Sequence, residues 1–227
     1  IAAIAFPAVL TQLATPVGQA YVTRAMAEFG EEAVAGMAMV GRLTPVAFGV
    51  IFALSGAIGP IIGQNFGAGK HQRVERAFRE GLLFVGLYVV GATALLIVMR
   101  EHLADLFGAS GDARTLVYLF CGPLALAFFF NGMLFVSNAA FNNLGHPFYS
   151  TWINWGRHTL GTIPPVIVFA AWLGAPGVLI GQAAGGVVFG LLSIVLARRV
   201  MAKRGSVPEV SAFARQGRLM QLLHLRR

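Results

Sequence analysis

Charged residues are scarce in this chain. Only 11% of its 227 residues are Asp, Glu, Lys or Arg, against roughly 25% in a typical soluble domain. Because a surface in contact with water needs charged groups, much of this surface is expected to face lipid. Hydrophobic residues make up 57% of the chain, and its 28 glycines suit helices that pack closely in a bilayer. We therefore predict an integral membrane protein.

Cysteine and acidic residues are few as well. The single cysteine, Cys121, cannot form an intrachain disulfide, and its apolar surroundings indicate a small core residue. The nine acidic residues all fall outside the cores of the apolar runs, which leaves no intramembrane carboxylate pair for acid–base chemistry. No Ser–His–Asp set and no metal-spaced cluster is visible in the sequence. We expect neither an enzyme nor a cofactor.

The apolar residues form six runs, each long enough for a bilayer-spanning helix of about 20 residues. The predicted spans are residues 1–27, 33–63, 76–99, 115–143, 148–173 and 177–199. Prolines interrupt several of them, which membranes tolerate because neighbouring helices satisfy the freed carbonyls. The expected fold is all-α, with a six-span transmembrane lobe over residues 1–202 and a basic cytoplasmic tail over residues 203–227.

Basic residues are concentrated on one side of the predicted bundle. The link between the second and third spans, and the end of the sixth span with the tail, are rich in Lys and Arg, whereas the opposite links mix arginine with acidic residues. Because cytoplasmic links carry the basic excess, both chain ends are expected in the cytoplasm of a bacterium, in a multi-pass protein of the inner membrane. We attribute the net charge of +8 to this topology, not to nucleic-acid binding. Two interpretations of the tail stay open, a short helix on the anionic leaflet or a disordered basic segment.

Polar side chains inside the predicted spans are the candidate functional residues. An arginine at bilayer depth is costly and normally faces a partner or a watery cavity. Residues three and four apart share one helical face, which groups polar residues on the first, fourth and fifth spans. The predicted cleft-lining residues are Gln12, Gln19, Arg42, Asn131, Asn138, Asn154, Arg157 and His158. The alternative is that they hold helices together by hydrogen bonds or, for Arg42, that the side chain snorkels to the interface.

A glycine-rich segment follows the second span. It does not match the phosphate-binding pattern Gly-x-x-x-x-Gly-Lys-Ser/Thr, because Gln64 stands at the first glycine position and His71 follows Lys70. The segment is better interpreted as a helix end in which left-handed glycines turn the chain at the inner membrane surface. The residues predicted to form this inner turn are Gly63, Gln64, Asn65, Gly67 and Gly69.

Several sequence elements occur in a distinctive order. They are the segment 7–24, Glu32-Ala33-Val34-Ala35-Gly36, Arg42-Leu43-Thr44-Pro45, Gly59-Pro60 followed by Gly63-Gln64-Asn65-Phe66-Gly67-Ala68-Gly69, and Asn142-Asn143-Leu144-Gly145-His146-Pro147. This order resembles the multidrug and toxic compound extrusion (MATE) family, over about residues 1–202. The Gly-Gln-Asn-Phe-Gly-Ala-Gly element is its most specific part.

The resemblance implies that the chain is one lobe, more similar to the C-terminal one, of a twelve-span transporter with two lobes related as parallel repeats. It implies efflux of cationic or amphipathic compounds, drugs and other xenobiotics among them, in antiport with H⁺ or Na⁺ by alternating access. The family's coupling carboxylates lie within spans, so the coupling-ion site is expected in the missing N-terminal lobe, with His158 or a Gln12-based site as the alternative. The implied partners are a small organic substrate, membrane lipid, and that lobe or a second copy of this chain.

Two other functions stay open at the level of sequence. A lipid-linked precursor flippase or polysaccharide exporter of the same superfamily would use Arg157 and Arg42 to bind phosphate groups. A non-transporting membrane partner or scaffold would account for spans without carboxylates.

Overall fold

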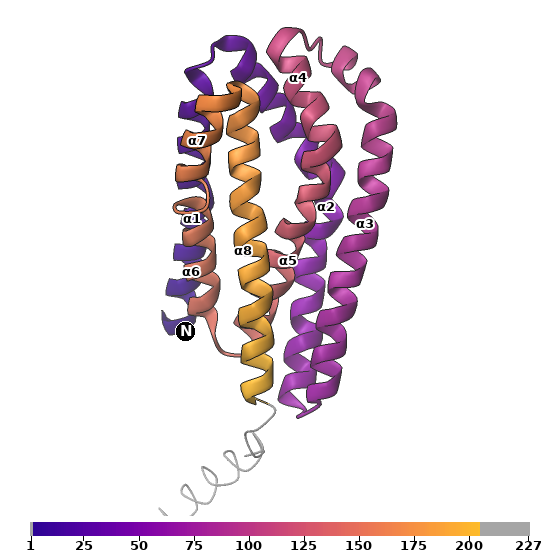
Figure 1. Cartoon of the computed structure of the whole chain (residues 1–227). Helices are drawn as coiled ribbons and strands as arrows, with labels where there is room; N and C mark the ends of the chain where they lie inside the picture. The colour runs from indigo at the N-terminus through magenta and orange to yellow at the C-terminus, as the bar shows by residue number, and fades with distance from the viewer. Residues whose placement is uncertain (1, 205–227) are drawn as a thin grey trace, which may run out of the picture.

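The computed structural model of the chain describes residues 2–204, with side chains for residues 9–203. Regular structure within this range is entirely helical (Figure 1). In chain order the elements are α1 (Ala2–Ala27), α2 (Glu31–Gly67), α3 (His71–Leu106), α4 (Gly111–Leu119), the π-helical segment η1 (Phe120–Leu124), α5 (Ala125–Asn143), α6 (Pro147–His158), α7 (Ile163–Leu173) and α8 (Ala175–Arg204). The all-α class expected from the sequence is confirmed, whereas the predicted tail beyond residue 204 lies outside the described residues.

Four helical stretches are long and apolar enough to cross a membrane. They are Glu31–Gly67, His71–Leu106, Gly111–Asn143 and Ala175–Lys203. The other two predicted spans are helical too, as α1 and as the pair α6 and α7, and they complete the bundle (Figure 1). α1 is interspersed with Gln and Thr, and the fifth span is divided in two, so neither is a long uninterrupted apolar helix.

Two of the helical columns are broken in mid-course. In the fourth, Gly122 has φ −111° and ψ −107°, outside the helical region, and Pro123 follows it. In the fifth, the helix stops after His158 and restarts with prolines in the first turn of α7. N–H groups in the first turn of a helix have no acceptor within that helix, so prolines there cost no hydrogen bond. The Thr162 hydroxyl donates to the Arg157 carbonyl oxygen at 2.8 Å. A side-chain hydroxyl inside the protein therefore satisfies a carbonyl that the helix break leaves free.

The glycine-rich segment between α2 and α3 forms a tight helix-ending turn. Gly69 has a φ of +71°, the left-handed conformation that glycine adopts without strain. The Lys70 N–H donates to the Asn65 carbonyl oxygen at 2.8 Å and the Gly69 N–H donates to that of Phe66 at 3.0 Å. These two bonds define a Schellman motif, which satisfies carbonyls that the helix end would otherwise leave free.

This turn packs against the second motif that carried the family resemblance. The Asn143 side chain, at the end of α5, lies against the surface of α2 where Gly59 and Gly63 lack side chains, so that a Cβ at Gly63 would stand 2.8 Å from Asn143 Oδ1. Asn143 Nδ2 in turn donates to the Ala139 carbonyl oxygen at 2.8 Å. Two elements far apart in sequence thus meet at one end of the bundle.

The two ends of the bundle differ in charge. The end that holds the α2–α3 turn and the C-terminal part of α8 carries Lys70, Arg73, Arg79 and Arg198, whereas the opposite end, with the α1–α2 and α3–α4 connections, carries several carboxylates (Figure 1). This is the distribution that the sequence indicated. Which end faces the cytoplasm stays a prediction.

Helix α8 packs closely on its neighbours through a row of glycines. Gly177, Gly181 and Gly185 recur every four residues and therefore share one face of the helix. Along this face lies the backbone around α7: a Cβ at Gly181 would stand 2.6 Å from Val166 Cα, and Gly185 meets the backbone of Gly161. Small residues at such spacing let two backbones approach in a membrane protein.

Candidate substrate cavity

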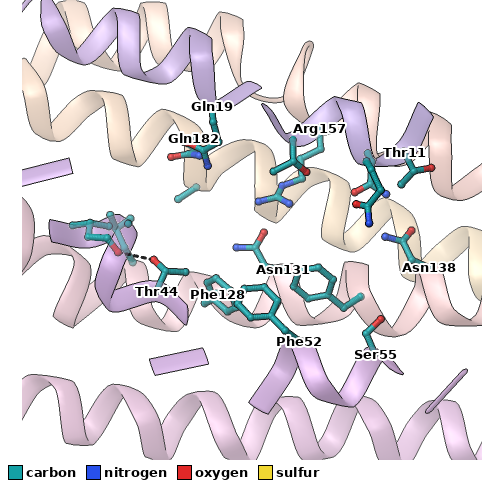
Figure 2. A pocket seen from close by; sticks show the side chains of 18 of the residues that line it. Thr11, Gln19, Thr44, Phe52, Ser55, Phe128, Asn131, Asn138, Arg157 and Gln182 are labelled. Carbon is teal, nitrogen blue, oxygen red and sulfur yellow. Dashed lines mark hydrogen bonds between the residues drawn. The ribbon is translucent and has the colours of Figure 1, made fainter. Parts of the chain in front are cut away.

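A cavity of about 570 Å³ lies inside the helical bundle (Figure 2). α1 and α6 form one side of it, α2 and α5 the opposite side, and residues of α8 and η1 complete the wall. The volume is in the range of sites for small organic molecules. Hydrogen bonds join α1 to α6: Trp155 Nε1 donates to the Leu10 carbonyl oxygen at 2.9 Å, and the hydroxyls of Thr11 and Thr151 are 3.0 Å apart.

The structure brings most of the sequence-predicted cleft residues to this cavity. Those that line it are Gln12, Gln19, Asn131, Asn138, Asn154 and Arg157. They come from three different predicted spans, which the sequence could group only within each helix. Their role in binding stays a prediction.

His158 does not line the cavity. It is buried, 4% exposed, between α6 and α1, where its ring packs on Gly18 and its Nε2 is 3.4 Å from Thr15 Oγ1. Consecutive residues on a helix are about 100° apart in direction, and here Arg157 faces the cavity while His158 faces α1.

Arg42 also lies outside the cavity. Its side chain is exposed on α2, whereas its helix neighbours Gly41 and Thr44 line the cavity. The position of Arg42 agrees with the snorkelling alternative, in which the side chain extends to the membrane interface.

Several lining residues were not among the predicted site residues. Gln182 of α8, Ser55 and Thr44 of α2, and Ser150 of α6 contribute polar atoms. Gln182 could have been found, because it is a lone amide in the apolar run of the sixth span. Phe128 lines the cavity and stacks on Phe48 with ring centroids 4.1 Å apart.

Arg157 is the charged member of the lining. It is the only ionisable side chain among the cavity residues that the structure describes. It occupies the last turn of α6, where the helix dipole favours a cation. Figure 2 shows its guanidinium group directed into the cavity, toward the amide of Asn131 on the opposite side. Within residues 2–204, no carboxylate forms an ion pair with it.

A chain of hydrogen bonds fixes the amides beside Arg157. The Ser150 hydroxyl donates to Asn138 Oδ1 at 2.7 Å, and Asn154 Nδ2 donates to the Ser150 carbonyl oxygen at 2.8 Å. Ser150 is 2% exposed and Asn154 9% exposed. These contacts hold Asn138, on α5, in a defined position relative to α6.

Asn131, unlike Asn138, has a side-chain oxygen without a hydrogen-bond partner in the described part of the chain. This oxygen, Oδ1, is buried. It faces α8 at Gly186, where a Cβ would stand 3.4 Å from Oδ1. Buried polar atoms in proteins nearly always have a partner, so this oxygen is an exception within the described part of the chain.

Comparison with solved structures places this fold among known transporters. A MATE transporter of Vibrio cholerae, VcmN in its bent form, superposes with a TM-score of 0.84 at 22% identity, over 89% of this chain and 46% of the other. At this level of identity the match shows the fold alone.

Sequence comparison gives two closer relatives. A Pseudomonas savastanoi protein described as an uncharacterized 21 kDa protein in the iaaL 5′ region is 39% identical over 201 residues, which is 84% of this chain and 63% of that protein. A protein of Shewanella oneidensis named FAD transporter is 28% identical over 200 residues, which is 88% of this chain and 44% of that protein. The chain thus spans less than two thirds of the length of each relative.

The MatE family model matches residues 7–168. The match includes the glycine-rich turn, the Asn-Asn-Leu-Gly-His-Pro turn and most of the residues that line the cavity. This chain belongs to the MatE family.

Proposed function

We propose that this chain is one six-span lobe of a secondary active transporter that exports amphipathic organic compounds. The observation that carries the proposal is the cavity of about 570 Å³, bordered by α1, α2, α5, α6 and α8 and lined by amides, phenylalanines and one arginine. A site with a large apolar wall and a few placed polar groups suits binding of small organic molecules. Membership of a transporter family and a relative named FAD transporter support transport as the activity.

Alternating access is the mechanism that this architecture favours. The chain covers about half of the transporter of known structure with the same fold, so a second lobe would close the cavity from the other side. Rocking of the two lobes would then expose the bound compound to each side of the membrane in turn. Both helix breaks border the cavity. One is at η1, whose Phe120 and Leu124 line it, and the other follows His158, next to the lining residue Arg157. A change of helix direction at either break would reshape the cavity.

The energy source in this proposal is an H⁺ or Na⁺ gradient, used in antiport. No carboxylate lines the cavity within the described residues, so the coupling-ion site is assigned to the other lobe. The protein would lie in the inner membrane of a bacterium, with the basic end of the bundle in the cytoplasm. Expected substrates include xenobiotics and multidrug-type compounds. Because the only charged lining residue among those described is a cation, amphipathic compounds are favoured as substrates over cationic ones.

The flippase alternative loses support in the structure. It relied on two intramembrane arginines for the phosphate groups of a lipid, and Arg42 lies outside the cavity. A single arginine beside an aromatic wall fits a small amphipathic molecule better than a lipid pyrophosphate.

A pair of tryptophan substitutions on α8 tests the role of the cavity. Ala183 lines the cavity, whereas Val188 on the same helix is 59% exposed. The complete native protein is placed in proteoliposomes, and movement of a fluorescent organic dye is measured after imposing an H⁺ or Na⁺ gradient. We expect gradient-dependent movement that Ala183→Trp abolishes, because the indole occupies the cavity, and that Val188→Trp leaves intact.

The transport proposal fails if the wild-type protein moves no dye under either gradient. It also fails if Ala183→Trp and Val188→Trp transport equally well, since the compound would then use another route.

A further inference from the structure

We propose that the cavity binds a planar organic anion, with Arg157 holding its acidic group and the phenylalanine wall holding its ring system. This inference names the substrate class of the proposed transporter and therefore rests on the transport proposal above. It is built from the charge of the lining, the amide groups beside it, and the geometry of the aromatic side.

The charge of the cavity has one sign. Arg157 is its only ionisable lining residue in the described part of the chain, and its guanidinium group is directed into the open space (Figure 2). An unpaired arginine at membrane depth is costly, and a carboxylate, sulfonate or phosphate group is the natural counter-ion because it accepts two parallel N–H bonds from the guanidinium. An organic cation would instead approach a like charge.

Amide groups around Arg157 extend the polar side of the site. Asn138 is held by Ser150, and Asn131 carries a buried oxygen without a partner. Figure 2 shows both amides directed into the same space as the guanidinium. They place amide groups next to one fixed positive charge, and a few polar groups beside a charge are the composition of a site that binds and orients an acidic molecule.

The opposite side of the cavity is aromatic. Phe128 stacks on the fully buried Phe48 with an interplanar angle of 8°, which fixes the orientation of its ring. Phe52 stands edge-on to Phe128 with centroids 6.0 Å apart, and Phe135 packs edge-on to Phe52 with centroids 5.2 Å apart. Phe52, Phe128 and Phe135 all line the cavity. Such a wall accepts a planar ring by stacking or edge contacts.

Two xenobiotic dyes with the same ring system test the charge preference. Fluorescein is a xanthene anion and its rhodamine counterpart is a cation, so they differ mainly in charge. Proteoliposomes of the complete native protein are assayed for gradient-dependent movement of each dye, and binding of each dye to the detergent-solubilised protein is measured by fluorescence polarisation. Three variants are compared with the wild type: Arg157→Gln, Arg157→Lys and the control Arg79→Gln, which removes an exposed arginine in the N-terminal third of α3.

We expect the wild-type protein to bind and move fluorescein in preference to rhodamine. Arg157→Gln should weaken fluorescein binding at least tenfold, because a charge-assisted pair is lost. Arg157→Lys should recover part of that loss, and Arg79→Gln should behave as wild type. A merely structural role for Arg157 would weaken binding of both dyes equally, and that result overturns the inference.

The remaining outcomes separate the two proposals. Movement of rhodamine without fluorescein overturns the anion site and leaves the transport proposal standing. Binding of fluorescein that depends on Arg157, without movement of either dye, supports the anion site and counts against transport. Failure to bind or move fluorescein, with no movement of rhodamine, overturns both.

Discussion

The glycine row on α8 permits a sharp test of how this bundle is held together. Gly181 faces the α7 backbone so closely that a Cβ at this position would stand 2.6 Å from both Val166 Cα and Val166 N, and 2.8 Å from Pro165 C. Ordinary van der Waals contact begins at 3.4 Å. Because the obstructing atoms are backbone, no side-chain rotation relieves the overlap, and α7 and α8 must separate locally by about 0.8 Å.

The cost of this separation follows from the packing. A gap of roughly 0.5–1 Å already removes a quarter to a half of the dispersion energy of each contact along the groove, and overpacking of this kind costs about 1–3 kcal/mol. We expect Gly181→Ala to destabilise the protein by about 2 kcal/mol. For a chain of this size, that corresponds to a Tm lowered by about 4–8 °C.

Gly91 on α3 provides the matched control. A Cβ at Gly91 would meet nothing within 4 Å among the described residues. The Gly91→Ala substitution therefore adds a methyl group without overlap, and the higher helix propensity of alanine, worth about 1 kcal/mol at most, should leave the Tm unchanged or raise it. The comparison isolates close backbone packing from the general effect of replacing glycine.

Buried Cys121 supplies the assay. Its side chain is 0% exposed in the folded chain, so it reacts with a thiol-reactive fluorophore only when the bundle opens. This reaction is used to monitor thermal unfolding of the complete protein in detergent for the wild type, Gly181→Ala and Gly91→Ala. Equal Tm values for the two variants would refute the argument that the glycine row is required for the approach of α7 to α8.

Two further substitutions test local features of the fold. Gly69→Ala should lower stability by about 1 kcal/mol, because alanine in the left-handed conformation is strained. The control Gly67→Ala, in the helical part of the same turn, should not lower it. Thermal unfolding of both variants measures the difference, and an unchanged Tm for Gly69→Ala would contradict the role of the turn. The hydroxyls of Ser137 and Ser193, both 0% exposed, are 3.1 Å apart between α5 and α8. A double-mutant cycle with alanine should return a coupling of about 0.6 kcal/mol, typical of interhelical hydrogen bonds in membranes, and strictly additive effects would show that the contact contributes nothing.

The sequence predicted the helical columns well because each depends on local composition. The apolar runs located the helical columns. Prolines accompany both interruptions, at Pro123 and before Pro164, but α2 continues unbroken through Pro45. The glycine-rich turn was equally accessible, since a helix end with a left-handed glycine depends on only a few consecutive residues. The basic excess at one end of the bundle needed only a comparison of links.

The sequence was less successful with the direction of individual side chains. Helical spacing grouped Arg157 with His158, yet the structure directs one into the cavity and buries the other against α1. For Arg42 the sequence left two alternatives open, because whether a residue on a helix faces lipid, a neighbour or a cavity depends on which helices surround it. Gln182 was overlooked because a single amide in an apolar run has no polar neighbour on the same helical face.

The sequence by itself determined the membrane class, the helical columns of the bundle and the family, because hydrophobicity, proline and glycine act over short stretches of chain. Only the tertiary structure decided the cavity. Its lining joins residues of α1, α2, α5, α6 and α8, and their meeting depends on close packing such as that of Gly181 on the α7 backbone. That packing, which no single helix encodes, leaves Arg157 as the charged group among the amides and phenylalanines of the site.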